Sequence, residues 1–438
     1  MKRKWLGAAT LISALVLTGC ASGSSDTPAG TDSTGTEVQQ DADGPKSLLV
    51  WVDAVREPAC LKYKDLMAGE VEITCEVVGQ EEILSKIQLS NQTGQGWPDV
   101  TFDQPNNVAI YQDVSNGFAL NLSNYLDASV FDAYNTSNDW CLIEDSYWCL
   151  KNDLAQTVIW YDTVIFDELG LTVPTTMEEF AATALQLKGT GYIAGSIGDQ
   201  GFYAGYLWPS GCPMVNVLDP ATVQINADSP NCSRVWELVQ PLVDAGVLDT
   251  RSSFDAGFLA DVAQQQKVAM HIGPSWWGEF VIRPVDSWAI PEGRIAAAPM
   301  PTWAGESTNW SGEWGGGIWV ASAYSEFPQA AAEAVKYLAT DPDLMAEGVT
   351  FPGSQPAFEA WSTRLAADPY YASDPTVALI EQAGKIRQDN KPVRYDMQGQ
   401  FGAMNSAING GESIESAVRA YITALENIAP SAGYTVTK

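Results

Sequence analysis

Residues 47–78 read SLLVWVDAVREPACLKYKDLMAGEVEITCEVV, and this stretch decides the class of fold. Leu48–Val52 is a short apolar run that suits a buried strand, Glu57–Met67 suits a helix, and Val71–Val78 alternates as a second strand does. A strand, a helix and another strand in succession are typical of proteins in which helices cover mainly parallel sheets. The sequence therefore predicts an α/β fold.

The same alternation continues beyond this stretch. We expect strands at Asp99–Phe102 and Leu154–Trp160, helices at Glu82–Leu89, Asn106–Ser115 and Thr163–Glu168, and a capping box that joins Thr175 or Thr176 to Glu178 and Glu179. Such sheets bind ligands beyond the carboxyl ends of their strands. Asp53, Asp103 and Gln104 follow strands and are therefore candidate ligand-binding residues. The alternatives are a turn residue at Asp53 and a helix cap at Asp103.

The N-terminus predicts export and lipid anchoring. Three basic residues precede an apolar run at 6–17, which is shorter than the about 20 residues of a permanent membrane span. We therefore expect a signal peptide at 1–19. The run ends in LTGC, which matches the bacterial lipobox and predicts a lipidated Cys20 outside the cytoplasm. The alternative is a plain signal peptide in which Cys20 has no role. The polar segment 20–46 is expected to be a flexible tether.

Composition limits the classes of function. The chain has 438 residues, which suggests two domains behind the tether. It carries 54 acidic against 23 basic residues, so its formal net charge is −31. A surface of this charge repels phosphate backbones and anionic lipid, which argues against nucleic acid as a partner. We expect contact with the membrane through the lipid anchor only.

The cysteines favour disulfides over a metal. Seven are present, and six remain once Cys20 is lipidated. Sequence alone cannot choose the connectivity, but proximity favours Cys60–Cys75, Cys141–Cys149 and Cys212–Cys232. No C-x-x-C pair occurs and His271 is the only histidine, so we expect neither a zinc site nor a cofactor.

Several motifs, in order along the chain, resemble one known family. They are Gly96–Val100, Asn116–Leu122, Val158–Asp162, Phe166–Leu171 with Pro174–Phe180, Lys267–Trp277, and Gly315–Gly317 with Ala330–Ala339. Their order is similar to that of the extracellular solute-binding proteins of carbohydrate ABC transporters, the maltose-binding-protein-like family 1 lipoproteins. The resemblance implies a two-lobe periplasmic-binding-protein fold with a hinge, which clamps an oligosaccharide and delivers it to a permease. It also implies a monomer that binds its ligand without acting as an enzyme.

The resemblance also implies where the lobes meet. Lobe one is expected at 47–153 plus 312–352, and lobe two at 154–311 plus 353–438. The chain should cross between them near Asp153–Ala155, Trp303–Gly312 and Phe351–Gln355.

A sugar site needs aromatic rings against the C–H faces and polar groups around the hydroxyls. The family places a sugar-stacking Trp after a Gly-Pro turn, where this chain has Trp276 and Trp277; either one of them stacks on ligand or both belong to the core. The full expected set is Asp53, Asp103, Gln104, Asp153, Trp208, Trp276, Trp277, Glu313, Trp314 and Arg394. For Glu313 the alternative is an exposed side chain, and for Arg394 a surface ion pair.

Two other functions stay open at this stage. A glycosidase needs only two carboxylates, which a chain this acidic supplies anywhere. An importer receptor for a small molecule other than a sugar is the second alternative, although 16 Trp favour a sugar. A hydrolase with a Ser-His-Asp triad is disfavoured because no G-x-S-x-G elbow is present.

Overall fold

The computed structural model describes residues 38–111, 117–134, 137–388 and 393–438. The expected signal peptide at 1–19 and Cys20 lie outside these residues. The compact body begins at Gln40. Within the described ranges, no helix has the length and apolar character needed to cross a membrane.

The first half of the body is built on a five-stranded sheet. Its order is β2 (Val71–Val77), β1 (Lys46–Val52), β3 (Val100–Asp103), β13 (Ile318–Ala321) and β6 (Leu150–Lys151). β1 pairs in parallel with β2 and β3, whereas β13 runs antiparallel to both β3 and β6. The strands predicted around residues 48, 71 and 99 are therefore confirmed, and the later strand β13 completes their sheet from the distant C-terminal half.

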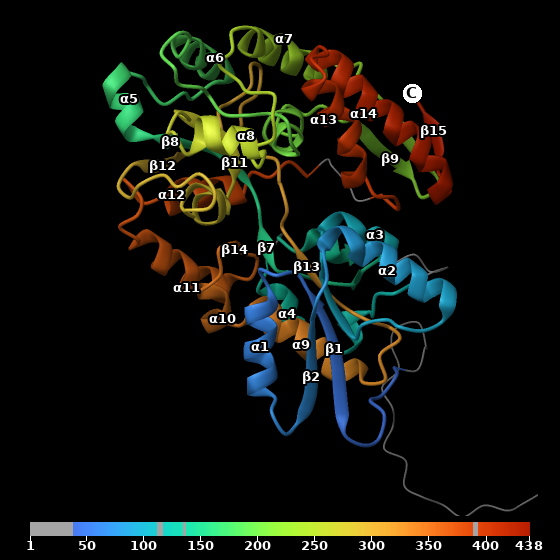
Figure 1. The fold of residues 1–438 in the computed structure, drawn as a ribbon. Helices are drawn as coiled ribbons and strands as arrows, with labels where there is room; N and C mark the ends of the chain where they lie inside the picture. The colour runs from blue at the N-terminus through green and yellow to red at the C-terminus, as the bar shows by residue number, and fades with distance from the viewer. Residues whose placement is uncertain (1–37, 112–116, 135–136, 389–392) are drawn as a thin grey trace, which may run out of the picture. The chain divides into compact units, whose positions relative to one another are not determined.

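Helices cover both faces of this sheet (Figure 1). The elements are α1 (Glu57–Leu66), α2 (Gln80–Thr93), α3 (Val108–Tyr111), α4 (Ala128–Asp132), α9 (Pro328–Thr340) and α10 (Pro342–Ala346), with short strands β4 (Leu142–Ile143) and β5 (Ser146–Tyr147). Val50 and Val52 pack with α1 and α9, whereas Trp51 packs with α2 and α3. Successive side chains of a strand point to opposite faces, so an unbroken apolar run is what a doubly covered strand requires.

The second half of the body has a different sheet. β8 (Thr157–Asp162) lies between β11 (Met270–Pro274) and β12 (Ile295–Ala298) and is antiparallel to both. The α/β class is confirmed, but the expected mainly parallel pairing holds for β1–β3 and not here. The register shows how these strands run: Thr157 at the start of β8 pairs with Pro274 at the end of β11. β8 therefore leaves the junction with the first half, while β11 returns to it.

A single large apolar cluster surrounds this second sheet. Its helices are α5 (Thr163–Leu169), α6 (Met177–Gln186), α7 (Pro230–Asp244), α8 (Ala256–Phe258), α11 (Gln355–Ala366), α12 (Thr376–Ala383), α13 (Phe401–Asn409) and α14 (Ile414–Ile428), and a small sheet contains β9 (Val215–Asp219), β10 (Thr222–Ile225) and β15 (Thr435–Thr437). The predicted capping box at the start of α6 is confirmed, with Thr176 as the cap and Glu179 as its partner.

The chain crosses between the two apolar cores at three places that lie side by side. β7 (Asp153–Leu154) pairs antiparallel with β14 (Phe351–Pro352). Gln156 in turn forms a bridge to Glu313. The strand predicted at 154–160 is divided here, because the crossing strand β7 ends before β8 begins. Two cores joined by paired crossings confirm the two-lobe architecture, while the lobe limits given above remain a prediction.

One expectation near the first lobe needs correction, and another is confirmed in part. Residues 41–46, assigned to the tether, contact the body: Asp41 Oδ1 accepts a hydrogen bond from Gln329 N at 2.8 Å, and the Ala42 amide donates to the Glu326 carbonyl at 2.9 Å. The reason is that Asp41 supplies an acceptor for an unpaired amide at the start of α9. The helix predicted at Asn106–Ser115 is confirmed over its described part, as a 3₁₀ turn at Pro105–Asn107 followed by α3, while residues 112–116 lie outside the described ranges.

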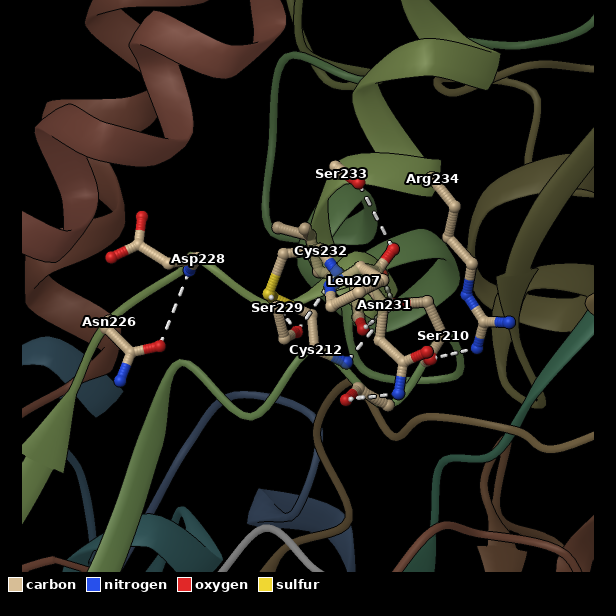
Figure 2. The surroundings of a disulfide bond; sticks show 12 residues. Leu207, Ser210, Cys212, Asn226, Asp228, Ser229, Asn231, Cys232, Ser233 and Arg234 are labelled. Carbon is tan, nitrogen blue, oxygen red and sulfur yellow. Dashed lines mark hydrogen bonds between the residues drawn. A yellow bond between two sulfur atoms is a disulfide. The ribbon is translucent and has the colours of Figure 1, made fainter.

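The cysteine pairs nearest in sequence form disulfides. Cys60–Cys75 joins α1 to β2, and Cys141–Cys149 closes the β4–β5 hairpin. Cys212–Cys232 joins a turn to the start of α7 (Figure 2).

Candidate functional site

A cavity of about 210 Å³ lies where the two lobes meet. Its lining comes from the ends of β1 and β3, the crossing at Asp153, the segment 276–280 that follows β11, and the glycine run before β13. Val349 and Thr350 before β14, and Gln398, complete it. The cavity therefore takes its residues from chain segments on both sides of the crossings.

One wall is polar and centres on Arg56. Its Nη1 lies 3.2 Å from Asp53 Oδ2, and its Nη2 lies 3.2 Å from Asp153 Oδ1. The guanidinium also lies over the Phe102 ring, with Cζ 4.2 Å from the centroid. The Asp153 side chain is buried, whereas those of Asp53 and Arg56 remain 13% and 15% exposed. This wall presents charged hydrogen-bond donors and acceptors that a ligand can reach.

Two glutamines extend the polar wall from β1 to β3. Gln80 Nε2 donates to Asp53 Oδ2 at 2.9 Å, and Gln104 Nε2 donates to Gln80 Oε1 at 2.8 Å. Both side chains line the cavity and are half-buried. Because each amide is held through one of its groups, its orientation is fixed before a ligand arrives.

The other wall is aromatic. Trp276 meets Trp314 and Phe280 edge to face, with ring centroids 5.4 and 5.7 Å apart. Trp276 Nε1 donates to the Trp314 carbonyl at 2.8 Å, which fixes the indole and leaves its ring partly exposed to the cavity. In each edge-to-face pair the edge of one ring meets the face of the other, so these contacts hold the rings in place while part of Trp276 stays exposed at the cavity.

The glycine run lets the backbone pass close to this site. Gly316 has a φ of 78°, which disfavours a side chain, and a Cβ on it would lie 2.3 Å from Glu313 Oε1. A Cβ on Gly317 would lie 2.0 Å from Phe102 Cζ. Substitution of Gly316 would therefore displace Glu313 or the backbone, and substitution of Gly317 would displace Phe102, which lines the cavity.

The structure brings five of the expected ligand-binding residues together around this cavity: Asp53, Gln104, Asp153, Trp276 and Trp314. Sequence reasoning missed Arg56, Gln80, Phe280 and Thr350, which also line it. Arg56 had a detectable pattern, since it lies three residues after Asp53 at the start of a helix and can reach back to it. No local pattern indicated Thr350, which a distant crossing places.

Asp103 does not line the cavity, contrary to expectation. It is fully buried and accepts hydrogen bonds from Tyr111 Oη, from Asn107 Nδ2 at 3.0 Å and from Gln104 N at 2.7 Å. Burial raises the pKa of its carboxyl to about 6 against the opposing effect of these donors. Asp103 therefore fixes the turn that carries Gln104, which is close to the capping role considered as its alternative.

Trp277 belongs to the core, so Trp276 is the member of the pair that faces the cavity. Trp277 has no exposed area and stacks on His271, with centroids 4.9 Å apart. Burial lowers the pKa of His271 to about 3, so its ring is neutral. The sequence did not show which of the two Trp residues faces a ligand, and only Trp276 lines the cavity.

Glu313 is not exposed, and it lines two other cavities rather than this one. Its Oε1 lies 2.9 Å from Lys151 Nζ and accepts a hydrogen bond from Ala155 N at 3.2 Å, and both side chains of the ion pair are almost fully buried. Burial raises the pKa of Glu313, while Lys151 opposes that effect. Glu313 therefore ties its own crossing segment to the neighbouring one, because Lys151 lies on β6 and Ala155 lies directly after β7.

Trp208 and Arg394 also do not line the cavity between the lobes. Trp208 is buried and donates from Nε1 to the Arg387 carbonyl at 2.9 Å. It lines a narrow side cavity, which shares Gln104 and Gly315 with the cavity between the lobes. The turn that follows it is held by Cys212–Cys232 (Figure 2). Arg394 lies over Tyr434 and donates to the Pro220 carbonyl at 2.8 Å.

Comparison with known proteins gives a family model and solved structures. The model described as bacterial extracellular solute-binding protein matches residues 62–378. No curated protein matches the chain. The galacto-N-biose-/lacto-N-biose I-binding protein of the ABC transporter from Bifidobacterium longum, in complex with lacto-N-biose, is similar with a TM-score of 0.76 at 16% identity, over 91% of this chain and 100% of that one.

Two further solved structures are similar over nearly the whole chain. The ABC transporter associated binding protein from B. animalis subsp. lactis, in complex with beta-1,6-galactobiose, has a TM-score of 0.74 at 20% identity over 90% of this chain and 100% of that one. An ABC substrate-binding protein from Listeria monocytogenes, in complex with cycloalternan, has a TM-score of 0.70 at 13% identity over the same shares. At these identities the likeness shows the fold, and it confirms the two-lobe arrangement.

Proposed function

The chain belongs to the family of bacterial extracellular solute-binding proteins, and from this premise we propose that it is the receptor of an ABC importer whose ligand is an oligosaccharide. The family places it outside the cytoplasm as a binding protein. The sugar, the residues that hold it and the mode of anchoring are parts of this proposal.

The observation that carries the proposal is the pairing of an aromatic wall with a charged wall in one cavity. Trp276 offers a ring face for the C–H face of a sugar, while Asp53 and Arg56 offer charged partners for hydroxyls. Apolar burial on an indole can contribute a few kcal/mol, and hydrogen bonds to charged groups about 1.5–3 kcal/mol each. A neutral sugar needs both kinds of contact at once.

Known ligands of structurally similar proteins support a sugar. Those proteins were solved with lacto-N-biose, beta-1,6-galactobiose and cycloalternan. In the proposed cycle a sugar enters between the lobes, contacts both walls, and stabilises the closed form by binding it better than the open form. The closed protein then docks on a membrane permease.

The proposal includes lipidation of Cys20 and a monomeric state. Two or three acyl chains hold a protein at a membrane without a spanning helix. Replacement of Cys20 by Ser should move the protein from the membrane fraction to the soluble fraction of cells that produce it. Retention in the membrane fraction would contradict the anchor.

A thermal-shift screen against oligosaccharides tests the ligand class. The panel contains lacto-N-biose, beta-1,6-galactobiose, cycloalternan and maltotetraose. A ligand at 100 times its Kd adds about 2.7 kcal/mol to the free energy of unfolding. Trp276→Ala should lose the shift, whereas Trp97→Ala should keep it, because Trp97 stacks on Tyr324 and does not line the cavity.

Two results of the screen would contradict the proposal. If pure protein released smaller sugars from the panel, the chain would be a carbohydrate-active enzyme. If no member of the panel shifted the melting temperature while a peptide or other small molecule did, the ligand class would be wrong.

A further inference from the structure

A salt bridge near the cavity between the lobes joins two separate parts of the chain, Glu279 and α11. Arg364 on α11 donates from Nη1 and Nη2 to the two carboxylate oxygens of Glu279, at 2.8 and 2.9 Å. The same guanidinium donates from Nε to the Ala346 carbonyl at 2.6 Å and from Nη2 to the Gly348 carbonyl at 3.0 Å. One side chain therefore holds both a carboxylate and the backbone that follows α10.

Both partners of Arg364 adjoin residues that line the cavity. Glu279 lies in the segment 276–280, whose ends Trp276 and Phe280 contribute to the aromatic wall. Gly348 lies in the segment 346–350, whose last two residues also line the cavity. Neither Arg364 nor Glu279 lines the cavity itself, so any effect on a ligand acts through these neighbours.

The contact is built to hold a fixed spacing. A guanidinium that meets a carboxylate with two parallel hydrogen bonds fixes orientation as well as distance. The Glu279 side chain is only 11% exposed, so water competes little for it. Trp361, one turn earlier on α11, donates from Nε1 to the Gly348 carbonyl at 3.0 Å. Segment 346–350 is therefore tied to α11 at two side chains.

We infer that Arg364 is a positioning residue that fixes the spacing between segments 276–280 and 346–350, and thereby sets the size of ligand that the cavity accepts. This inference rests on the proposed function of the cavity as a sugar site. With the contact broken, Phe280 and Val349 are free to separate. The cavity then loses contacts to a short sugar, while a longer one that reaches beyond them is less affected.

The test compares Arg364→Gln and Glu279→Gln with a matched control, Arg283→Gln. Arg283 Nη1 lies 2.7 Å from Asp368 Oδ2, so it joins the chain just beyond segment 276–280 to the residues that follow α11, and neither residue adjoins the cavity lining. Hydrogen exchange of the ligand-free protein should become about tenfold faster in 276–280 and 346–350 in the first two variants. The control should leave both segments unchanged.

Binding supplies the second measurement. The Kd for beta-1,6-galactobiose should rise about tenfold in Arg364→Gln, and the Kd for maltotetraose should rise less, so the ratio of the galactobiose Kd to the maltotetraose Kd rises. Arg364→Lys, which keeps the charge but not the planar fork, should restore neither exchange nor the ratio.

The outcomes separate this inference from the proposed function. Unchanged exchange in Arg364→Gln, or equal acceleration in Arg283→Gln, would overturn the positioning role. Faster exchange with an unchanged Kd ratio would overturn the role in ligand size. If the wild type bound neither sugar, the proposed function would fail, and exchange alone would decide whether Arg364 fixes the two segments.

Discussion

β1 and β3 are parallel neighbours in one mixed sheet and their carboxyl ends adjoin, yet the aspartates at these ends have different surroundings. Asp53 pairs with Arg56 and lines the cavity. Asp103 is fully buried and accepts hydrogen bonds from Tyr111 and Asn107. The end of a strand places a residue near the cleft, but the donors on the helix that follows decide which way its carboxylate points.

The largest expected effect is on stability at the end of β3. Asp103→Ala leaves the buried Tyr111 hydroxyl and the Asn107 amide without their acceptor, so we expect the free energy of unfolding to fall by about 3 kcal/mol. Asp53→Ala should lower it by less than about 1 kcal/mol, because its partners remain partly exposed. Urea denaturation of both variants measures the difference, and equal losses would contradict the contrast.

At the end of β1 we expect the opposite pattern, in which Asp53 matters for sugar binding more than for stability. Asp53→Ala should weaken sugar binding by about 1.5–3 kcal/mol, since it removes a charged acceptor and the partner that orients Arg56. Isothermal titration with the best sugar of the panel measures this loss. Asp65 is an exposed acid on α1, the helix that follows Asp53, so Asp65→Ala serves as the control and should bind as the wild type does. An unchanged Kd in Asp53→Ala would remove the end of β1 from the site.

A smaller expected effect is the pH dependence of stability that comes from Asp103 at the end of β3. Burial raises the pKa of Asp103 to about 6 from an unfolded value near 3.8, so the folded state holds this proton more tightly. Its contribution to stability is then present at about pH 4 and is lost as the pH rises through 6, with a slope of at most about 1.4 kcal/mol per pH unit. Asp103→Asn should flatten the unfolding free energy over this window. A slope equal to that of the wild type would show that Asp103 does not titrate there.

The same contrast shows how far sequence reasoning reaches. Periodicity located β1, α1, β2 and β3 because each element buries an apolar face that its own residues specify. It placed Asp53 and Asp103 equally near the cleft, because both follow strands. Only the later residues Arg56 and Tyr111, seen in three dimensions, distinguish the partly exposed Asp53 from the buried Asp103.

Residues whose role depends on distant partners were harder to predict. Glu313 is held by Lys151, which lies 162 residues earlier, so no local pattern indicated a buried ion pair. Trp276 and Trp277 are adjacent in sequence, and the one-residue offset that decides which faces the cavity comes from how β11 ends. The sequence predicted the class of fold, and five of the ten residues it indicated line the cavity, while packing determined the rest.

The last and smallest effect tests the link between the two strand ends. Gln80 accepts from Gln104 at the end of β3 and donates to Asp53 at the end of β1. Gln80→Leu should weaken sugar binding by about 1 kcal/mol, because Gln104 loses its acceptor and Asp53 one of its donors. The effects of substitutions at residues that share one hydrogen-bond network are not additive. The double variant with Asp53→Ala should therefore lose less affinity than the two single losses together, by about 0.5 kcal/mol or more. Strict additivity in titration would show that the ends of β1 and β3 contact a ligand independently.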